Sequence, residues 1–269
     1  MRRSMLVSLI VSLMFTMSGL VRAGVGVPDA NNDYPYVGVM VIFDLDAPAD
    51  PIGANVSAFC SGVLISEIHF LTAAHCIDWI STVNDPFIGV SFADLAAPII
   101  STMIPVTGYS MHPGYPPGQF VFRNDLGIVA LAPGYTLGIT PASLPLEGYL
   151  DDLAAEGELV GQPVVNVGYG VVPFLTRPPG YFPPDGVRSI FTSTFLGLDQ
   201  NFVRQRQNLN ADDEGGSASG DSGSPKFLPG ETTILAITSW GDPTGREFGA
   251  NVRVDTPEAL SFINGFLQP

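Results

Sequence analysis

Short apolar stretches rich in β-branched residues recur along this chain, and each is bounded by glycine, proline, asparagine or aspartate. This pattern is typical of β-strands joined by tight turns. Only 14% of the 269 residues are charged, which argues against long charged helices and coiled coils. The stretches lie at residues 36–43, 61–65, 88–92, 126–131, 164–168 and 234–239. We therefore expect an all-β protein, either a barrel or a sandwich.

The clearest helix is expected near the C-terminus, over residues 256–267. Thr256 can cap this helix, and Pro257 suits its first turn. Its apolar face would consist of Leu260, Phe262, Ile263 and Phe266. Two stretches rich in proline, glycine or serine, residues 173–186 and 207–220, are expected to be surface loops.

The first 23 residues have the pattern of a secretory signal. Arg2 and Arg3 precede an apolar run from Met5 to Leu20, and Val21 and Ala23 supply the small residues that a signal peptidase reads. The alternative is a retained membrane anchor, for which the apolar run is short. We expect cleavage after Ala23, secretion to an extracellular or periplasmic space, and no stable membrane association afterwards.

The chain is strongly acidic, with a formal net charge of -15 at pH 7 and Lys226 as its only lysine. Such a surface repels the phosphate backbone of nucleic acids, and the sequence has no polybasic patch for anionic membranes. We therefore expect no nucleic-acid partner.

Two cysteines, Cys60 and Cys76, are the only ones present. In an exported protein such a pair is expected to form a disulfide. Oxygen ligands alternate at Asn208, Asn210 and Asp212, as at the start of a calcium loop, but the later glycine and bidentate acid of that loop are missing. We expect no metal and no cofactor.

Three short motifs contain the residue types that nucleophilic catalysis needs. LTAAHC places His75 after an apolar strand, NDLGIVAL places Asp125 at the start of another, and GDSGSP places Ser222 in a glycine-flanked turn. Each has an ordinary structural explanation by itself, as a packed histidine, a strand-end cap or a turn residue. Together they follow the order His, Asp, Ser, which is one of the known orders of a catalytic triad.

These motifs, with the later Ser239-Trp240-Gly241, resemble the landmarks of the chymotrypsin-like, or trypsin-fold, serine peptidases. The resemblance extends from about Pro35 to the terminal helix. It implies an all-β fold of two packed antiparallel β-barrels with a C-terminal α-helix, within a domain over residues 24–269. The barrels would span about residues 36–138 and 150–255, with the helix at about 256–267.

The resemblance also implies the chemistry. His75 would take the proton of the Ser222 hydroxyl, and Asp125, supported by Ser239, would hold the imidazole in the required tautomer. The N–H groups of Gly220 and Ser222 would form the oxyanion hole. We expect a secreted, monomeric serine endopeptidase that cleaves polypeptides through an acyl-enzyme. Cys60 and Cys76 match the two halves of the family's histidine-loop disulfide.

By the same resemblance, the substrate-binding residues are Gly216, Ser217, Ser239, Trp240, Gly241 and Gly249, and we call them the primary pocket. An acid at the position of Gly216 would select lysine or arginine. A glycine there predicts a neutral, roomy pocket that prefers apolar or aromatic side chains. Asp212, Asp213 and Glu214 are close enough that a shifted alignment would place an acid in the pocket.

The chain departs from the family pattern in the turn around the expected nucleophile and near the expected activation cut. Ser224 stands where the family has a second glycine, and no lysine or arginine lies between Gly24 and Val37 for an activating cut. In the family, the partner of the acid at Asp221 is the α-ammonium that activation creates. We therefore hypothesise that signal cleavage itself lets Gly24-Val25-Gly26 insert toward Asp221. The alternative is that backbone or side-chain donors satisfy Asp221.

Two other function classes fit the sequence less well than a peptidase does. A catalytically inactive homologue that acts as a binding protein would usually have lost a triad residue, and none is lost here. An esterase of the α/β-hydrolase fold needs Gly-x-Ser-x-Gly, with the serine ahead of the acid and the histidine. Ser224 replaces the second glycine, and the chain order is wrong for that fold.

Overall fold

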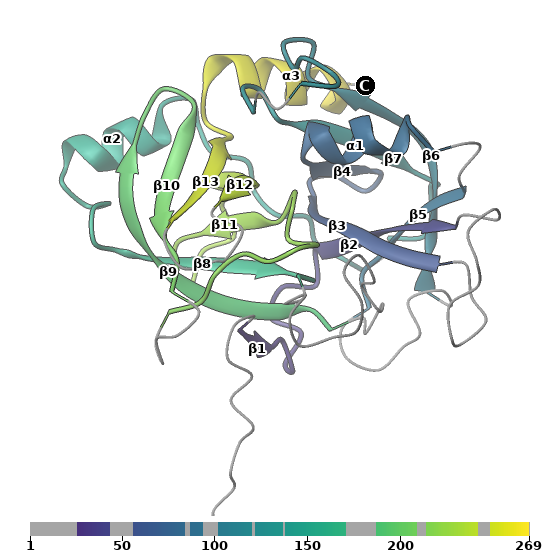
Figure 1. Ribbon diagram of the computed structural model, residues 1–269, viewed down its shortest axis with the longest axis horizontal. Coiled ribbons are helices and arrows are strands. Elements are labelled where there is room, and N and C mark those ends of the chain that lie inside the picture. Colours follow the sequence, from purple (N-terminus) through teal and green to yellow (C-terminus); the bar gives the residue numbers. More distant parts are fainter. Residues whose placement is uncertain are drawn as a thin grey trace, which may run out of the picture.

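The computed structural model describes residues 26–43, 56–83, 87–93, 102–119, 122–136, 138–170, 187–208, 214–241 and 248–268. The predicted signal segment, the predicted loop 173–186, and Asn210 and Asp212 of the calcium-like stretch lie outside the described residues. Two β-barrels lie side by side, with the C-terminal helix across the top of the view in Figure 1.

The first barrel is closed by six antiparallel strands in the order β2-β3-β4-β7-β6-β5. Its interior is filled by buried aliphatic and aromatic side chains such as Met40, Phe70 and Leu71, as expected for short strands that alternate between core and solvent. The strands are β2 (Val37–Phe43), β3 (Val56–Leu64), β4 (His69–Thr72), β5 (Phe87–Ser91), β6 (Ile104–Met111) and β7 (Gly127–Leu131).

The second barrel runs in the order β8-β9-β10-β13-β12-β11 and is closed by pairing of β8 with β9. The two-residue strand β1 (Val27–Pro28) pairs with the edge of β9, so the beginning of the described chain belongs to the second barrel. The other strands are β8 (Pro163–Gly168), β9 (Ser189–Leu198), β10 (Phe202–Arg206), β11 (Pro225–Phe227), β12 (Ala236–Gly241) and β13 (Phe248–Arg253). The predicted fold class is therefore confirmed.

Three helices accompany the barrels: α1 (Ala74–Ile80), α2 (Tyr149–Ala155) and α3 (Pro257–Leu267). Thr256 caps α3 by accepting the N–H of Ala259, with 3.2 Å between N and Oγ1. The helix lies against the first barrel, where Phe262 packs on His112 and Phe266 on His69. Within the described ranges, no helix has the length and apolar character needed to cross a bilayer.

A buried ion pair joins the beginning of the chain to both barrels. Arg188 Nε lies 2.7 Å from Asp29 Oδ2, and both side chains are fully buried. The same guanidinium donates to the carbonyl oxygen of Val37 in β2, at 3.2 Å, and to the side chain of Asn32. A buried pair needs such additional hydrogen bonds to offset its desolvation. The pair therefore fixes the N-terminal segment where the two barrels meet.

Candidate active site

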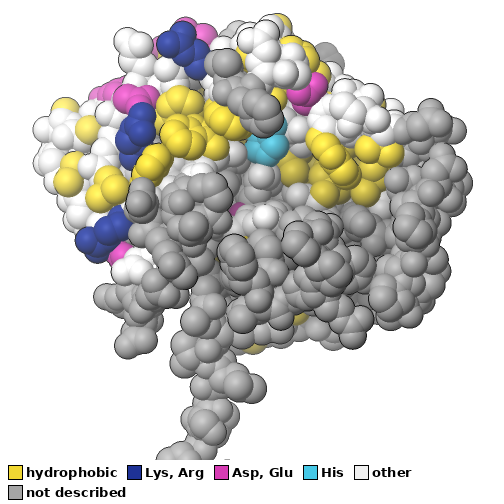
Figure 2. Space-filling view, in the orientation of Figure 1, with side chains coloured by type: hydrophobic (Ala, Val, Ile, Leu, Met, Phe, Trp, Pro, Cys, Tyr) yellow, Lys and Arg dark blue, Asp and Glu magenta, His cyan; other side chains and the backbone are white. Residues whose placement is uncertain are grey.

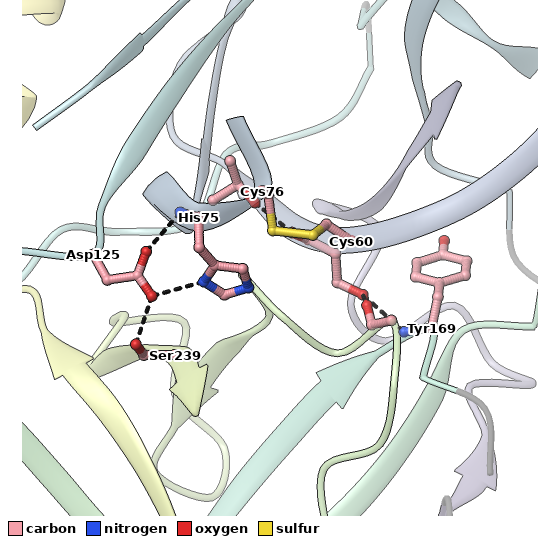
Figure 3. Close-up of a disulfide and its surroundings, with 9 residues drawn as sticks. Cys60, His75, Cys76, Asp125, Tyr169 and Ser239 are labelled. Atoms are coloured by element: carbon pink, nitrogen blue, oxygen red, sulfur yellow. Dashed lines mark hydrogen bonds and ion pairs between the residues drawn. A yellow bond between two sulfur atoms is a disulfide. The ribbon is translucent and has the colours of Figure 1, made fainter. Parts of the chain in front are cut away.

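His75 and Asp125 come together because the end of β4 lies beside the start of β7. Antiparallel pairing places Thr72 opposite Gly127, so the residues just after β4 are next to those just before β7. His75 is the second residue of α1, which begins directly after the extended residue Ala73. The Nδ1 atom of His75 lies 2.7 Å from Oδ2 of Asp125, as Figure 3 shows.

The carboxylate of Asp125 is fully buried and accepts three hydrogen bonds. The backbone N–H of His75 donates to Oδ1 at 2.8 Å, and the Ser239 hydroxyl donates to Oδ2 at 2.5 Å. The third donor is Nδ1 of the imidazole. Because a carboxylate can only accept, the ring proton must be on Nδ1, which leaves the Nε2 lone pair available to accept a proton.

Ser222 lies in a turn that only glycine permits on either side. Gly220 has a φ of 100° and Gly223 a φ of 84°, values that L side chains rarely adopt. A Cβ on Gly223 would lie 2.2 Å from Oγ1 of Thr72 and 2.3 Å from the carbonyl oxygen of Ser61. The turn is therefore pressed directly against the strands of the first barrel that lead to His75.

Ser61 fastens this turn to the first barrel. Its backbone N–H donates to the carbonyl oxygen of Ser222, and its hydroxyl donates to that of Gly220, both at 2.8 Å. The same hydroxyl accepts the N–H of Tyr169 from the second barrel at 3.0 Å. The neighbouring Cys60 forms a disulfide with Cys76, so one covalent bond links the strand that holds the serine turn to the helix that carries His75 (Figure 3).

Three groups in the serine turn have no hydrogen-bond partner among the described residues: the Ser222 hydroxyl and the backbone N–H groups of Gly220 and Ser222. The Ser222 hydroxyl makes no hydrogen bond to Nε2 of His75. Both residues are partly exposed, and 26% of the His75 side chain is accessible. The backbone N–H groups of Gly220 and Ser222 likewise donate to no group in the described part of the chain. Catalytic hydrogen bonds in proteins without substrate are often long or absent.

The glycines of the primary pocket face a side chain that the sequence analysis missed. A Cβ on Gly249 would lie 2.4 Å from Nε2 of Gln207, and one on Gly241 would lie 3.7 Å from its Oε1. Gln207 is 1% exposed, and neither polar atom of its amide has a partner in the described structure. The buried hydroxyl of Ser217 is also without a partner there. Glutamine after a strand gives no signal in sequence, so only the close approach reveals this residue.

Of the acids near the predicted pocket, Glu214 lies within the described residues. The Glu214 carboxylate accepts hydrogen bonds from Arg206 Nε, at 2.9 Å, and from the Thr194 hydroxyl, at 2.6 Å. The guanidinium of Arg206 holds the pKa of Glu214 below its ordinary value. Glu214 is therefore an ionised partner of Arg206 on β10. Asp212 and Asp213 lie outside the described residues.

Asp221, the residue before Ser222, is buried, and burial raises the pKa of its carboxyl group. Its Oδ1 accepts the N–H of Gly170 at 2.9 Å, and its Oδ2 accepts that of Ala218 at 2.8 Å. Of the segment hypothesised to insert here, Gly24 and Val25 lie outside the described residues, and Gly26 packs against Ile190 of β9.

Aromatic side chains surround the open side of the imidazole. Phe122 lies 6.3 Å from the His75 ring and stacks on Trp240, whose ring meets Phe248 edge-on. Figure 2 shows hydrophobic side chains gathered on both sides of a histidine on this face.

A sulfur of Cys60, a sulfur of Cys76 and a ring nitrogen of His75 lie within 4.8 Å of one another. Both sulfurs are in the disulfide, so this group offers no thiolate to a metal.

Comparisons with known proteins agree with this geometry. The family model described as Trypsin matches residues 26–263. Brachyurin from Leptuca pugilator is 27% identical over 90% of this chain and 94% of its own length. Trypsin from Sarcophaga bullata is 26% identical over 78% of this chain and 79% of its own. Among solved structures, human heparin binding protein has a TM-score of 0.63 at 20% identity, covering 91% of this chain and 96% of that one, which shows the shared fold.

Proposed function

The chain belongs to the trypsin family and is a serine endopeptidase, and we propose that it cleaves polypeptides through His75, Asp125 and Ser222 by way of an acyl-enzyme. The observation that supports this assignment best is the hydrogen bond from His75 Nδ1 to the buried Asp125 carboxylate, at 2.7 Å. It presents Nε2 as the base on the side of the ring away from Asp125.

In the first half-reaction, the Ser222 oxygen attacks the carbonyl carbon of the scissile peptide bond while His75 Nε2 takes the hydroxyl proton. The hydrogen bond between these groups forms as substrate closes the site. Asp125 stays ionised and stabilises the imidazolium. The imidazolium then gives its proton to the leaving amine nitrogen, the C–N bond breaks, and the acyl group remains on Ser222.

In the second half-reaction, water attacks the acyl carbon while Nε2 takes a proton from it, and that proton returns to the Ser222 oxygen as the ester bond breaks. In both steps, the carbonyl oxygen becomes an anion that the N–H groups of Gly220 and Ser222 bind. One such donor is worth roughly 3–4 kcal/mol of the barrier. The positive φ of Gly220 supports this role because it orients the peptide groups of the turn.

We further propose that the primary pocket takes a neutral side chain. Gly216 brings no charge, Glu214 is bound to Arg206, and the side chain that lies against Gly241 and Gly249 is the uncharged amide of Gln207. This is consistent with the sequence prediction of a neutral pocket in which basic side chains are not preferred, and it adds an amide to the groups proposed to face the substrate. Cleavage sites read by mass spectrometry in a peptide library test it, and strict cleavage after arginine would contradict it.

The decisive experiment compares the native enzyme with Ser222→Ala and His75→Ala. Both variants should keep the circular dichroism spectrum of the native protein, while kcat for a peptide falls by several orders of magnitude. A sulfonyl fluoride should label the native enzyme at Ser222 and leave Ser222→Ala unlabelled. Unchanged turnover by folded Ser222→Ala would end this proposal. Secretion after cleavage at Ala23, and the monomeric state, are tested by terminal sequencing and by sedimentation of the exported protein.

A further inference from the structure

Lys226 is the only lysine of the chain, and its side chain is fully buried. It is the middle residue of β11, the strand that begins three residues after Ser222. A buried ammonium is costly unless it is paired and hydrogen-bonded. A lysine in this position therefore requires a partner inside the second barrel.

The contacts of the ammonium lead to the serine turn. Nζ of Lys226 donates to the Ser224 hydroxyl at 3.2 Å and lies 5.7 Å from the centre of the Phe191 ring. The Ser224 hydroxyl also shares a hydrogen bond of 2.7 Å with that of Thr238. Ser224 is the residue that departs from the family motif, and the departure supplies the hydroxyl that this ammonium uses.

The negative charge that acts on Lys226 is that of Asp221. Burial lowers the pKa of Lys226 to about 7, and the Asp221 carboxylate opposes that shift. A Cβ on Gly168 would lie 2.3 Å from Oδ1 of Asp221 and 3.1 Å from Cβ of Ser224. The side chains of Asp221 and Ser224 therefore both lie against Gly168 at the end of β8. No ion pair within 4.0 Å joins the two charges in the described structure. Both groups are buried, and charges in a protein interior are more strongly coupled than charges in water.

We propose that Lys226 is a positioning residue: its ammonium, held by the Ser224 hydroxyl, is the internal positive partner of Asp221 and keeps the turn from Gly220 to Ser222 in its active shape. This inference rests on the proposed function. The sequence hypothesis took the positive partner of Asp221 to be a newly formed N-terminus. Here that partner is Lys226, a fixed residue of β11. The enzyme is then active whatever precedes Gly24.

A double-mutant cycle tests the coupling. Lys226→Met removes the charge at similar length and leaves Asp221 buried with no cation, so kcat should fall about tenfold or more, within the range of coupling between neighbouring charged groups. Asp221→Asn alone should also reduce kcat. The double variant should lose less than the sum of the two singles, because neither charge is then left alone. A purely structural role predicts additive losses, and additive losses would overturn the inference.

A second measurement concerns the N-terminus. Variants with two extra residues before Gly24, or with an acetylated terminus, should keep kcat within about twofold of the native value. Loss of activity on blocking the terminus would overturn the inference in favour of insertion. Each rate is normalised to the fraction of Ser222 labelled by the sulfonyl fluoride, which separates slow turnover from unfolded protein.

If circular dichroism shows that Lys226→Met does not fold, Ser224→Ala provides a second test. This substitution removes the hydroxyl that holds the ammonium and changes the side-chain volume little. It should reduce kcat while leaving KM nearly unchanged, and full activity would refute a role for the Ser224 hydroxyl in holding the ammonium. The outcome is also distinguishable from failure of the proposed function. A folded, fully active Ser222→Ala refutes the triad, whereas fully active Lys226 and Ser224 variants beside an inactive Ser222→Ala refute only this inference.

Discussion

The backbone N–H of Ser61 donates to the carbonyl oxygen of Ser222 across a distance of 2.8 Å. One strand of the first barrel thus holds the turn that carries Ser222 and leads into the second barrel. The relative position of the two barrels at the active site depends on this residue, whose hydroxyl adds hydrogen bonds to Gly220 and Tyr169.

Ser61→Ala should lower the free energy of unfolding by about 1–3 kcal/mol, because it leaves the buried carbonyl of Gly220 and the N–H of Tyr169 without their partner. The measurement is urea denaturation followed by fluorescence. Ser261→Ala, on the exposed face of α3, is the matched control and should change stability by less than about 0.5 kcal/mol. Equal stability of the two variants would show that the Ser61 hydroxyl does not hold the turn.

Gly223→Ala should abolish activity or folding, because its φ is 84° and the new methyl would lie 2.2 Å from Thr72 Oγ1. Gly230→Ala is the matched control, since Gly230 has a φ of 80° but open space around it. The control should cost only about 1 kcal/mol of backbone strain. Thermal unfolding and peptide hydrolysis of both proteins separate strain from collision. Similar behaviour of the two variants would contradict the close packing of the turn.

Ser239→Ala should reduce kcat by about tenfold to a hundredfold while preserving the fold, because the buried Asp125 carboxylate loses its donor at 2.5 Å, and a hydrogen bond to a charged group is worth about 1.5–3 kcal/mol. Ser239→Thr keeps the hydroxyl and should recover most of the rate. Steady-state kinetics with one peptide gives both values. An unaffected kcat in the alanine variant would mean that His75 and the backbone alone hold the carboxylate.

Stability should fall on acidification below about pH 6.5, the ordinary histidine pKa. Burial lowers the pKa of His112 and of His69, so the unfolded chain binds more protons than the folded one in this range, and lowering the pH favours unfolding. The pKa values of Asp151 and Glu214 are lowered by arginine partners. The stability that these two pairs contribute is therefore lost only at lower pH, where the carboxylates become protonated.

His112→Asn should weaken this pH dependence. Asparagine preserves an acceptor for the N–H of Gly114, which donates to Nδ1 of His112 at 3.0 Å, but it does not titrate. Urea denaturation at pH 7.5 and at pH 5.5 should show a smaller loss of stability in the variant than in the native protein. An identical loss in both would assign the effect to other groups.

The fold could be predicted largely because short β-branched runs and four motifs in order leave few alternatives. The terminal helix with its Thr256 cap follows from local signals, whereas the two barrels were expected from the resemblance to the trypsin-fold peptidases. The pairing of His75 with Asp125 was expected from chain order and is present in the structure. Their catalytic role remains a prediction.

Other features depend on packing between residues far apart in sequence. Gln207 can lie close to Gly241 and Gly249 only because these two residues lack side chains. The sequence identifies Lys226 only as the sole lysine, and no local pattern indicates that its side chain is buried. Ser61 acts through contacts with residues 159 and 108 positions away, and no local pattern encodes such contacts.

The ion pair of Asp29 with Arg188 has a consequence for how the chain folds. The two residues are 159 positions apart, so the N-terminal segment cannot dock until β9 has been synthesised. Closing so long a loop is entropically costly, and native contacts of this range slow folding. The first barrel needs no such partner and can close on its own strands beforehand. The segment around Asp29 is therefore synthesised early but reaches its final place only once Arg188 is available.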